Sequence, residues 1–329
     1  MCENFGILPD GRTAHLYTIS CGAVSAKVSD YGATLVQLWV PDKDGNLADV
    51  VLGCDDVTGY VEGYSYLGAT IGRNANRIKN ACFVLEGKTW TLPAFMGPHS
   101  LHSGPDCYHR RLWQAEQISY SSVVFTLHSP HGDQGFPGNA RIRVTYTLEY
   151  PSSLTISYDA SCDRMSVFNM TNHSYFNLAG HNRPERAMEQ TLMLPARYYT
   201  ACDWMNIPTG ELRKVDGTPM DFRTPKALGR DIHGFFRGYD HNFEVFCAPC
   251  AVLHDPHSGR TMSVTTDCPG VQLYTPGGIR TNGKGGIQYG KRPAVCLETQ
   301  FWPDAVHHPE WKQPFAKDYH SATTFQFSW

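Results

Sequence analysis

The sequence lacks the features that mark several large classes of protein. Its 28 Lys and Arg are outnumbered by 31 Asp and Glu, so a basic surface for nucleic acid is not expected. It has no run of about 18 or more apolar residues, so we expect no membrane-spanning helix. The first residues show neither a basic nor an apolar segment, so we expect no signal peptide. Together these absences predict a cytoplasmic protein that binds neither nucleic acid nor a membrane.

The 11 cysteines do not suggest a disulfide framework. Their number is odd and they are scattered, which without a secretory signal predicts reduced thiols. Cys247 and Cys250 have CxxC spacing, but the second such pair that a zinc ribbon needs is missing. We therefore interpret this pair as small apolar residues flanking a turn at Pro249.

The signature motifs of common enzyme classes are also missing. Residues 283–286 read Gly-Lys-Gly-Gly, but they lack the preceding glycine spacing and the following Ser or Thr of a phosphate-binding loop. No GxGxxG opens a helix, and neither HExxH nor GxSxG occurs. Phosphoryl transfer, nicotinamide chemistry and serine hydrolysis are therefore disfavoured.

The chain is rich in turn formers and in short alternating segments. It has 30 Gly and 21 Pro, with 12% aromatics, a mixture typical of many short strands joined by tight turns. From Ile142 to Tyr150 apolar and polar residues alternate, which predicts a strand with one buried face that includes Tyr150. The same period resumes at residues 154–158 after Pro151, so the two segments predict a hairpin.

Further hairpins are predicted by the same pattern, and nothing divides the chain. Residues 83–85 with 89–92, and 252–254 with 262–265, flank turn-forming residues. Residues 276–290 form a glycine-rich stretch long enough to be a functional loop. We find no internal repeat and no linker, so residues 1–329 are predicted to form a single all-β domain, a large β-sandwich.

Residues 169–178 are the most unusual segment of the sequence. They contain three Asn, one His and one Tyr, and because Asn is depleted in strands, a polar function is indicated. In an extended chain His173 and Tyr175 share one face, where an imidazole beside a phenol can transfer protons. The alternative is a hydrogen-bonded loop in which the histidine is structural.

A second segment leads an apolar run into a carboxylate. Residues 293–297 are followed by Glu298, which in an extended chain shares its face with Cys296 and Gln300. A carboxylate buried at the end of such a strand is costly unless it is paired or used, and burial would raise its pKa. The alternative is a glutamate on a sheet edge that reaches solvent.

Four other polar residues are more informative together than singly: Asn76, Arg77, His102 and Asp240. Each alone is consistent with a turn or a cap. Together with Glu298 and His173 they supply a carboxylate base, imidazoles, a guanidinium and amides near several aromatic rings. This inventory is typical of sites that bind sugars.

Seven short segments, in their order and spacing, resemble the motifs of the aldose 1-epimerases, the galactose mutarotase family. They are residues 72–78 (GRNANRI), 101–104 (LHSG), 171–178 (TNHSYFNL), 240–243 (DHNF), 255–260 (DPHSGR), 269–275 (PGVQLYT) and 297–300 (LETQ). The resemblance covers about residues 11–327. It implies the large β-sandwich known as the galactose mutarotase-like supersandwich.

The resemblance also implies a reaction and a set of roles. Glu298 matches the family's catalytic base and His173 its catalytic acid, for interconverting the α and β anomers of a free aldose such as galactose or glucose. Six residues match positions that hold the sugar: Asn76, Arg77, His102, Tyr175, Asp240 and Gln272. No metal ion and no organic cofactor is expected, the free sugar is the expected partner, and a monomer is expected.

The sequence departs from the family pattern near these motifs. Ser103 replaces one of two glycines, residues 107–110 (CYHR) stand where Gly-Phe-Asp-Lys is common, and Phe301 and Trp302 stand where a His-Phe pair is frequent. We expect the catalytic pair to be intact and the rim of the pocket to be altered, which leaves the preferred sugar open.

Three alternatives remain at this point. The same chemistry can act on a pentose, a disaccharide or an acidic sugar, for which Arg110 and Arg111 could bind a carboxylate, although we interpret them as a solvated pair. A glycoside-processing enzyme usually needs two carboxylates across one bond, whereas here one Glu is matched with a His. A non-catalytic sugar-binding domain would not need Glu298 and His173 together.

Overall fold

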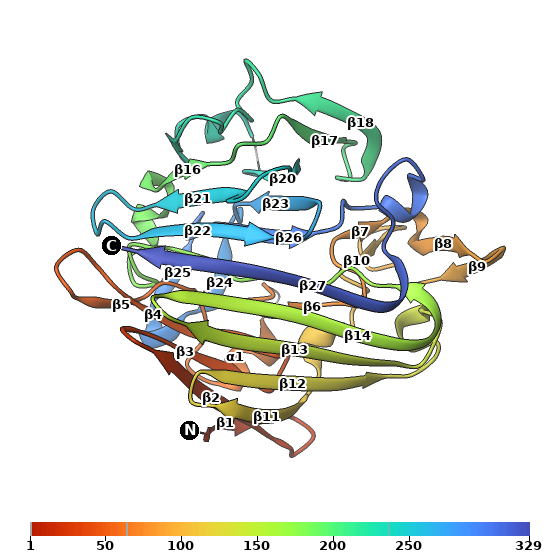
Figure 1. Ribbon diagram of the computed structural model, residues 1–329, viewed down its shortest axis with the longest axis horizontal. Helices are drawn as coiled ribbons and strands as arrows, with labels where there is room; N and C mark the ends of the chain where they lie inside the picture. Colours follow the sequence, from red (N-terminus) through yellow and green to blue (C-terminus); the bar gives the residue numbers. More distant parts are fainter. Residues whose placement is uncertain (1, 64, 236) are drawn as a thin grey trace.

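A nine-stranded antiparallel sheet forms one layer of the molecule (Figure 1). The computed structural model describes residues 2–63, 65–235 and 237–329. In spatial order the nine strands are β11 (Gln114–Ser119), β12 (Ser122–Ser129), β13 (Ala140–Glu149), β14 (Ser153–Val167), β27 (Phe315–Ser328), β22 (Thr261–Thr266), β21 (Ala251–His254), β16 (Thr191–Met193) and β19 (Lys226–Ala227). The C-terminal strand β27 thus lies in the middle of the sheet, where it joins segments far apart in the sequence.

Two five-stranded antiparallel sheets pack against this layer, one near each end of it in Figure 1. The first contains β1 (Cys2–Ile7), β2 (Thr13–Cys21), β3 (Val24–Ser29), β4 (Thr34–Pro41) and β5 (Leu47–Asp49) in sequence order. The second has the order β18 (Pro208–Lys214), β17 (Tyr198–Cys202), β20 (Asp240–Glu244), β23 (Gly270–Tyr274) and β26 (Cys296–Gln300).

Short strand pairs and single helical turns complete the structure. The pairs are β6 (Thr70–Ile71) with β15 (Thr171–Asn172), β7 (Arg77–Ile78) with β10 (Ser100–Leu101), β8 (Cys82–Leu85) with β9 (Lys88–Thr91), and β24 (Ile279–Asn282) with β25 (Gln288–Gly290). The α-helix α1 spans Val57–Glu62, and 3₁₀ turns span Lys79–Ala81, Tyr108–Arg110, Asp133–Gly135, Pro184–Glu189, Ile232–Gly234, Lys284–Gly286 and Ala305–His307.

One hydrophobic core joins the three sheets. Val144 of β13, Leu35 of β4 and Leu273 of β23 are fully buried members of the same cluster. The hydroxyl of Tyr146 on β13 donates a hydrogen bond to the carbonyl of Ala33 at 2.6 Å and so ties two layers together. The predicted all-β sandwich is therefore confirmed, because the alternating strands bury their apolar faces against one another.

The local predictions are confirmed with one correction. Strands β13 and β14 form the predicted hairpin, with Glu149 opposite Ser153, and the hairpins β8–β9 and β21–β22 also form. Tyr150 does not belong to the buried face, since its side chain is 85% exposed. It lies in the turn before Pro151, beyond the last paired residue, so no neighbouring strand covers it.

The turn at Pro249 separates an exposed Cys247 from a buried Cys250, and all eleven cysteines are free thiols.

The glycine-rich stretch 276–290 is held in place rather than left as an open loop. It contains β24, a 3₁₀ turn and β25. Lys284 in this turn is buried, and its ammonium donates hydrogen bonds to Asp49 and to the carbonyls of Val36 and Val51 at 2.5–2.8 Å. Burial lowers the pKa of Lys284, and Asp49 opposes that effect. The ion pair fixes the stretch to the first five-stranded sheet.

Arg73 fixes the segment that carries Asn76 and Arg77. It is completely buried, and its guanidinium donates hydrogen bonds to the carbonyl of Pro137 at 2.7 Å and to the hydroxyls of Ser166 and Ser129 at 3.0 and 2.6 Å. A buried charge is tolerated when acceptors surround it in this way. Arg73 therefore links β6 and β7 to the nine-stranded sheet.

Replacing Arg73 by leucine should destabilise the fold by on the order of 3 kcal/mol, because buried acceptors lose a charged donor. Urea unfolding followed by circular dichroism would measure the change. The matched control is Arg164→Leu, since Arg164 is exposed and, among the described residues, pairs with its neighbour Asp163 alone. Equal unfolding midpoints for the two variants would contradict the anchoring role of Arg73.

Candidate active site

One cavity of about 440 Å³ collects the polar residues that the sequence indicated. Seven of the eight predicted site residues line it: Asn76, Arg77, His102, His173, Tyr175, Asp240 and Glu298. The eighth, Gln272, lies directly behind the lining, and its amide donates a hydrogen bond to Asp240 Oδ1 at 2.6 Å. The structure therefore brings together residues separated by up to about two-thirds of the chain.

The register of three strands places the acidic and amide side chains on one face. Strand β20 pairs with β23, and β23 pairs with β26. Gln272 lies opposite Asn242 on one side and Glu298 on the other, so the three side chains point the same way. Asp240 precedes Asn242 by two residues and shares that face.

Glu298 is a buried carboxylate on this face. Strand β26 is at the edge of its sheet, yet all five of its residues are buried and Glu298 is only 3% exposed. The alternative of a glutamate that reaches solvent is therefore wrong. Its Oε2 atom is buried and accepts no hydrogen bond from any residue that the structure describes. A buried carboxylate oxygen without a donor is costly, which indicates a place for a ligand's hydroxyl.

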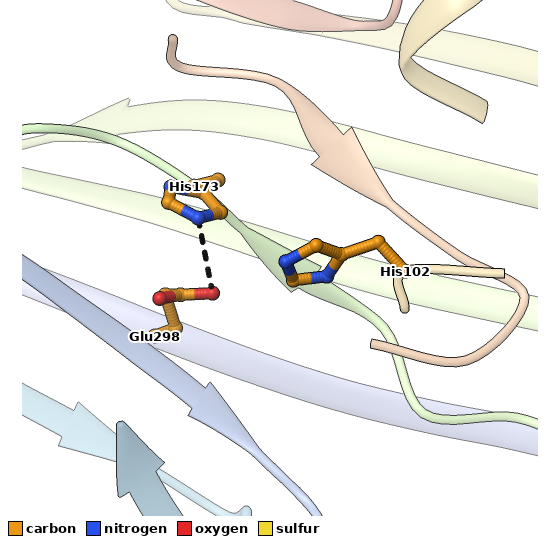
Figure 2. A group of neighbouring side chains, drawn as sticks. All are labelled: His102, His173 and Glu298. Carbon is orange, nitrogen blue, oxygen red and sulfur yellow. Dashed lines mark ion pairs between the residues drawn. The ribbon is translucent and has the colours of Figure 1, made fainter. Parts of the chain in front are cut away.

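His173 faces Glu298 from a different segment (Figure 2). Its Nε2 lies 3.6 Å from Glu298 Oε2, and the ring is almost completely buried. The ring stacks on Tyr175, with centroids 5.0 Å apart, so the predicted shared face of these residues is confirmed. On the other side of the ring, the thiol of Cys296 lies 3.6 Å from Nδ1. Backbone hydrogen bonds of His173 to Ala69 and Gly68 fix its position along the chain.

His102 presents a fixed hydrogen-bond donor to the cavity. The backbone N–H of Asn76 donates to His102 Nδ1 at 3.1 Å, so the proton of the neutral ring is on Nε2. Asn76 and His102 adopt positive φ angles of 60° and 50°, which non-glycine residues adopt at a cost and which recur at functional sites. The backbone N–H of His102 returns a hydrogen bond to the Asn76 carbonyl at 2.9 Å. This reciprocal pair holds the imidazole rigidly.

Asp240 is the centre of a hydrogen-bonded network in the cavity lining. It accepts from Arg77 Nη2 at 3.3 Å, from the Asn206 amide at 2.7 Å and from the Gln272 amide at 2.6 Å. Arg77 also donates to the Asn76 side-chain oxygen at 3.2 Å, while its buried Nε has no acceptor among the described residues. The network orients the Asp240 carboxylate and leaves the Nε–H of Arg77 without an acceptor among the described residues.

Burial moves the pKa values of the facing pair in opposite directions. Desolvation raises the pKa of Glu298 to about 8, with a further increase from Asp240 and a decrease from Arg77. Desolvation lowers the pKa of His173 to about 4. Between these values the pair holds a single proton, whose two possible positions are the carboxylate and the imidazole. Such separated pKa values are typical of acid–base sites.

The geometry also brings together a possible set of metal ligands, His102, His173 and Glu298, whose donor atoms lie within 4.8 Å of one another. The donor chemistry does not suit a cation. His102 Nδ1 is already occupied by the Asn76 N–H, and its Nε2 carries the ring proton, so neither nitrogen offers a free lone pair. Because burial also favours protonated Glu298, the residues fit a polar organic ligand better than a metal ion.

The departures from the family pattern do not form the rim as expected. Of the described residues, those that line the cavity do not include Ser103, Cys107, His109, Phe301 or Trp302. Ser103 instead bonds the backbone of Asn74, through Oγ contacts of 2.8 and 3.0 Å, and Trp302 donates to the Pro269 carbonyl. The expectation of a rim altered at these positions is therefore wrong, because none of these five described residues lines the cavity.

Several lining residues were not among the predicted site residues, and those with large polar side chains are Tyr66, Asn206, Arg237 and Tyr274. Tyr274 follows Gln272 by two positions on β23, so strand alternation could have found it. Asn206 and Arg237 lie in turns, and Tyr66 also lies outside the named strands, where periodicity carries no information. Their place in the site depends on tertiary structure.

Comparison with known proteins identifies the family of the chain. The family model described as aldose 1-epimerase matches residues 15–325. The chain belongs to the aldose 1-epimerase family. It is 38% identical to the galactose mutarotase of Bos taurus, with 98% of this chain and 97% of that protein covered. It is also 38% identical to the aldose 1-epimerase of Haemophilus influenzae, with 97% of each covered.

Solved structures lead to the same family. The GalM/aldose epimerase homologue of C. elegans superimposes with a TM-score of 0.90 at 31% identity, covering 96% of this chain and 99% of that one. The expected fold, a galactose mutarotase-like sandwich, and the expected class, an isomerase acting on carbohydrates, are thereby confirmed. Within the described residues of this aldose 1-epimerase family member, no helix is both long and apolar enough to cross a membrane.

Replacing Glu298 by glutamine should stabilise the protein, and increasingly so from about pH 4.5 to about pH 8. Over this range the native protein keeps a proton that the unfolded chain loses, so the contribution of Glu298 to stability falls as the pH rises. A glutamine side chain does not ionise, so the variant does not lose stability in this way. Thermal unfolding of the wild type and the variant at pH 5 and pH 8 would measure the effect.

The control for this comparison is Glu116→Gln on the exposed face of β11. It should give no pH-dependent difference in melting temperature. A difference between wild type and Glu298→Gln that is the same at both pH values would show that Glu298 titrates normally and would contradict the buried, raised pKa.

Proposed function

We propose that Glu298 and His173 are the acid–base pair through which this protein interconverts the α and β anomers of a free aldose such as galactose or glucose. The observation that carries the proposal is the buried Oε2 of Glu298, which has no hydrogen-bond partner among the described residues and lies 3.6 Å from His173 Nε2. Both residues line the cavity. A water-excluded carboxylate beside an imidazole, with no donor of its own, suits a ligand that brings a hydroxyl group.

Ring opening of a cyclic sugar needs two proton transfers at neighbouring oxygens. In the proposed mechanism Glu298, as general base, removes the proton of the C1 hydroxyl. His173, protonated at the start, donates its Nε2 proton to the ring oxygen, and the C1–ring oxygen bond breaks. The open aldehyde rotates about C1–C2 and closes on its other face, with the two roles exchanged. Because both transfers are assisted, neither a free alkoxide nor a protonated ring ether has to accumulate.

Sugar binding favours the protonation state that this mechanism requires. The empty pair shares one proton, and burial favours its position on Glu298. A C1 hydroxyl that donates to the carboxylate stabilises the ionised form and so favours the proton on His173. The close approach of the two groups allows this redistribution within the site.

The other lining residues provide the sugar's hydrogen-bond partners. The fixed Nε2–H of His102 and the free Nε–H of Arg77 are donors suited to the ring-side oxygens and to the carbonyl that develops at C1. Asp240 and Gln272 are suited to orient distal hydroxyls, with Asn76 behind Arg77. Tyr175 supports the His173 ring.

The rival functions are less well supported by the site. Glycoside hydrolysis usually needs a second carboxylate free to act at the same bond, but Asp240 is committed to three donors. A non-catalytic binding domain has no need for a buried carboxylate that faces an imidazole without a partner. Both observations favour ring opening.

We also propose that residues 1–329 form one domain that acts as a monomer in the cytoplasm. A single hydrophobic core that contains residues from Ile19 to Phe327 supports one domain. All eight site residues come from one chain, which supports a monomer, and eleven free thiols support a reducing compartment.

Glu298→Gln and His173→Asn should each lower kcat at least about 100-fold, because each removes one of two assisted proton transfers. Optical rotation after dissolving α-D-galactose or α-D-glucose would follow the reaction against the uncatalysed rate. Glu116→Gln on β11 and His254→Asn on β21 make the same replacements away from the cavity and should keep near-wild-type rates. Turnover close to wild type in either site variant would refute the assignment.

Activity should be nearly constant between about pH 4 and about pH 8 and fall on both sides. Below this range the pair gains a second proton and loses its base, and above it the pair loses its only proton and has no acid. The measurement is kcat/KM for galactose as a function of pH. A narrow optimum between about 4.5 and 6.5, the ordinary pKa values of the two side chains, would contradict the shifts.

A further inference from the structure

The charges of Arg77 and Asp240, which both line the cavity, balance each other. Arg77 is paired with Asp240, whose two oxygens also accept from Asn206 and Gln272. Burial lowers the pKa of His102 well below its ordinary value, so near pH 7 this side chain is neutral. The charges of Arg77 and Asp240 therefore cancel, and His102 adds none.

The catalytic pair also carries little net charge near pH 7. Burial lowers the pKa of His173 to about 4 and raises that of Glu298 to about 8, so one proton leaves the pair close to neutral. A neutral sugar would meet no unbalanced charge from these residues.

Arg237 is the exception among the residues that line the cavity. Its side chain is exposed, and within the described part of the chain its guanidinium makes no hydrogen bond, ion pair or ring contact. Because Arg237 is exposed whereas Glu298 and His173 are buried, Arg237 must lie toward the mouth of the cavity rather than at its floor. It adds one positive charge there that no described residue balances.

The residues directly after Arg237 are held against Thr275. Gly238 has φ +86° and packs so closely on Thr275 that an added Cβ would lie 2.4 Å from the threonine hydroxyl. The N–H of Tyr239 donates to that hydroxyl at 2.8 Å, and Arg292 donates to the carbonyl of Phe235 at 3.3 Å. The chain that follows Arg237 is thus held beside the stretch that begins at Pro276 and Gly277, which also line the cavity.

The arginines first considered for an acidic sugar do not reach the site. Arg111 forms ion pairs with Asp133 and Asp106 at 2.7 and 3.1 Å, and neither Arg110 nor Arg111 is among the lining residues. If the pocket receives an anionic substituent, Arg237 is the group placed to bind it.

We infer that Arg237 adapts the pocket to aldoses that carry an anionic group, a carboxylate or a phosphate, on the part of the sugar that stays at the mouth while C1 faces Glu298 and His173. A guanidinium binds either anion through two parallel N–H donors, whereas it gains less from a neutral hydroxyl. The inference rests on the proposed mutarotase function and adds the substrate class.

The test compares anomer exchange at equilibrium, measured by NMR, for D-galactose, D-galacturonate and D-galactose 6-phosphate at low ionic strength. We expect the wild type to exchange at least one of the anionic sugars about tenfold more efficiently than galactose. Arg237→Gln should lower this anion-to-galactose ratio about tenfold, and Arg237→Lys should retain most of it. Faster exchange of the uronate identifies a carboxylate, and faster exchange of the phosphate ester identifies a phosphate.

The matched control is Arg230→Gln, which removes an exposed arginine that pairs with Asp231 and does not line the cavity. It should leave the ratio unchanged. In the wild type, raising the salt from about 20 to about 200 mM should lower the ratio, and in Arg237→Gln it should not.

The outcomes separate the two proposals. If galactose exchange is accelerated but the ratio is the same in wild type and Arg237→Gln, the role of Arg237 is wrong and the mutarotase function stands. If none of the three sugars exchanges faster than without protein, the proposed function itself is wrong, and the inference falls with it.

Discussion

A carboxylate buried on the face of a sheet without a hydrogen-bond donor is the constraint around which this structure is arranged. Glu298 is 3% exposed and its Oε2 has no partner among the described residues. Such a group is unfavourable in a folded protein, and it persists only because the surrounding sheets are stable enough to hold it. The stability of the sandwich thus offsets the cost of a reactive group, and the raised pKa of Glu298 expresses that cost.

The contrast with the other buried charges is informative. Arg73 and Lys284 are as deeply buried as Glu298, but each is surrounded by acceptors. Through these hydrogen bonds Arg73 and Lys284 fix the segments that carry site residues to the large sheets. The charges of Arg73 and Lys284 are thus satisfied, whereas two residues that line the cavity, Glu298 and Arg77, each keep a buried polar atom with no partner among the described residues.

Much of the site follows from short-range rules once the strands are known. Alternation along β26 puts Glu298 on a single face with its second neighbours, and the same rule relates Asp240 to Asn242 and Gln272 to Tyr274. The pairing register then brings three strands' side chains together. Alternation relates His173 to Tyr175, but it does not place either histidine opposite Glu298. His102 and His173 lie outside the named strands, and their positions depend on backbone hydrogen bonds to residues distant in the sequence.

The sequence by itself determined the strand-rich fold and the hairpins, because alternation is a local property of the chain. Its ordered motifs, through their resemblance to a family, indicated eight residues, seven of which line the cavity. It did not determine the distances between Glu298, His173 and His102, the shifted pKa values, or which arginine lies at the cavity. It also misplaced Tyr150 and gave the departures near Ser103 and Trp302 a place at the rim. Only the tertiary structure decided these points, because burial and charge balance depend on segments that meet after folding.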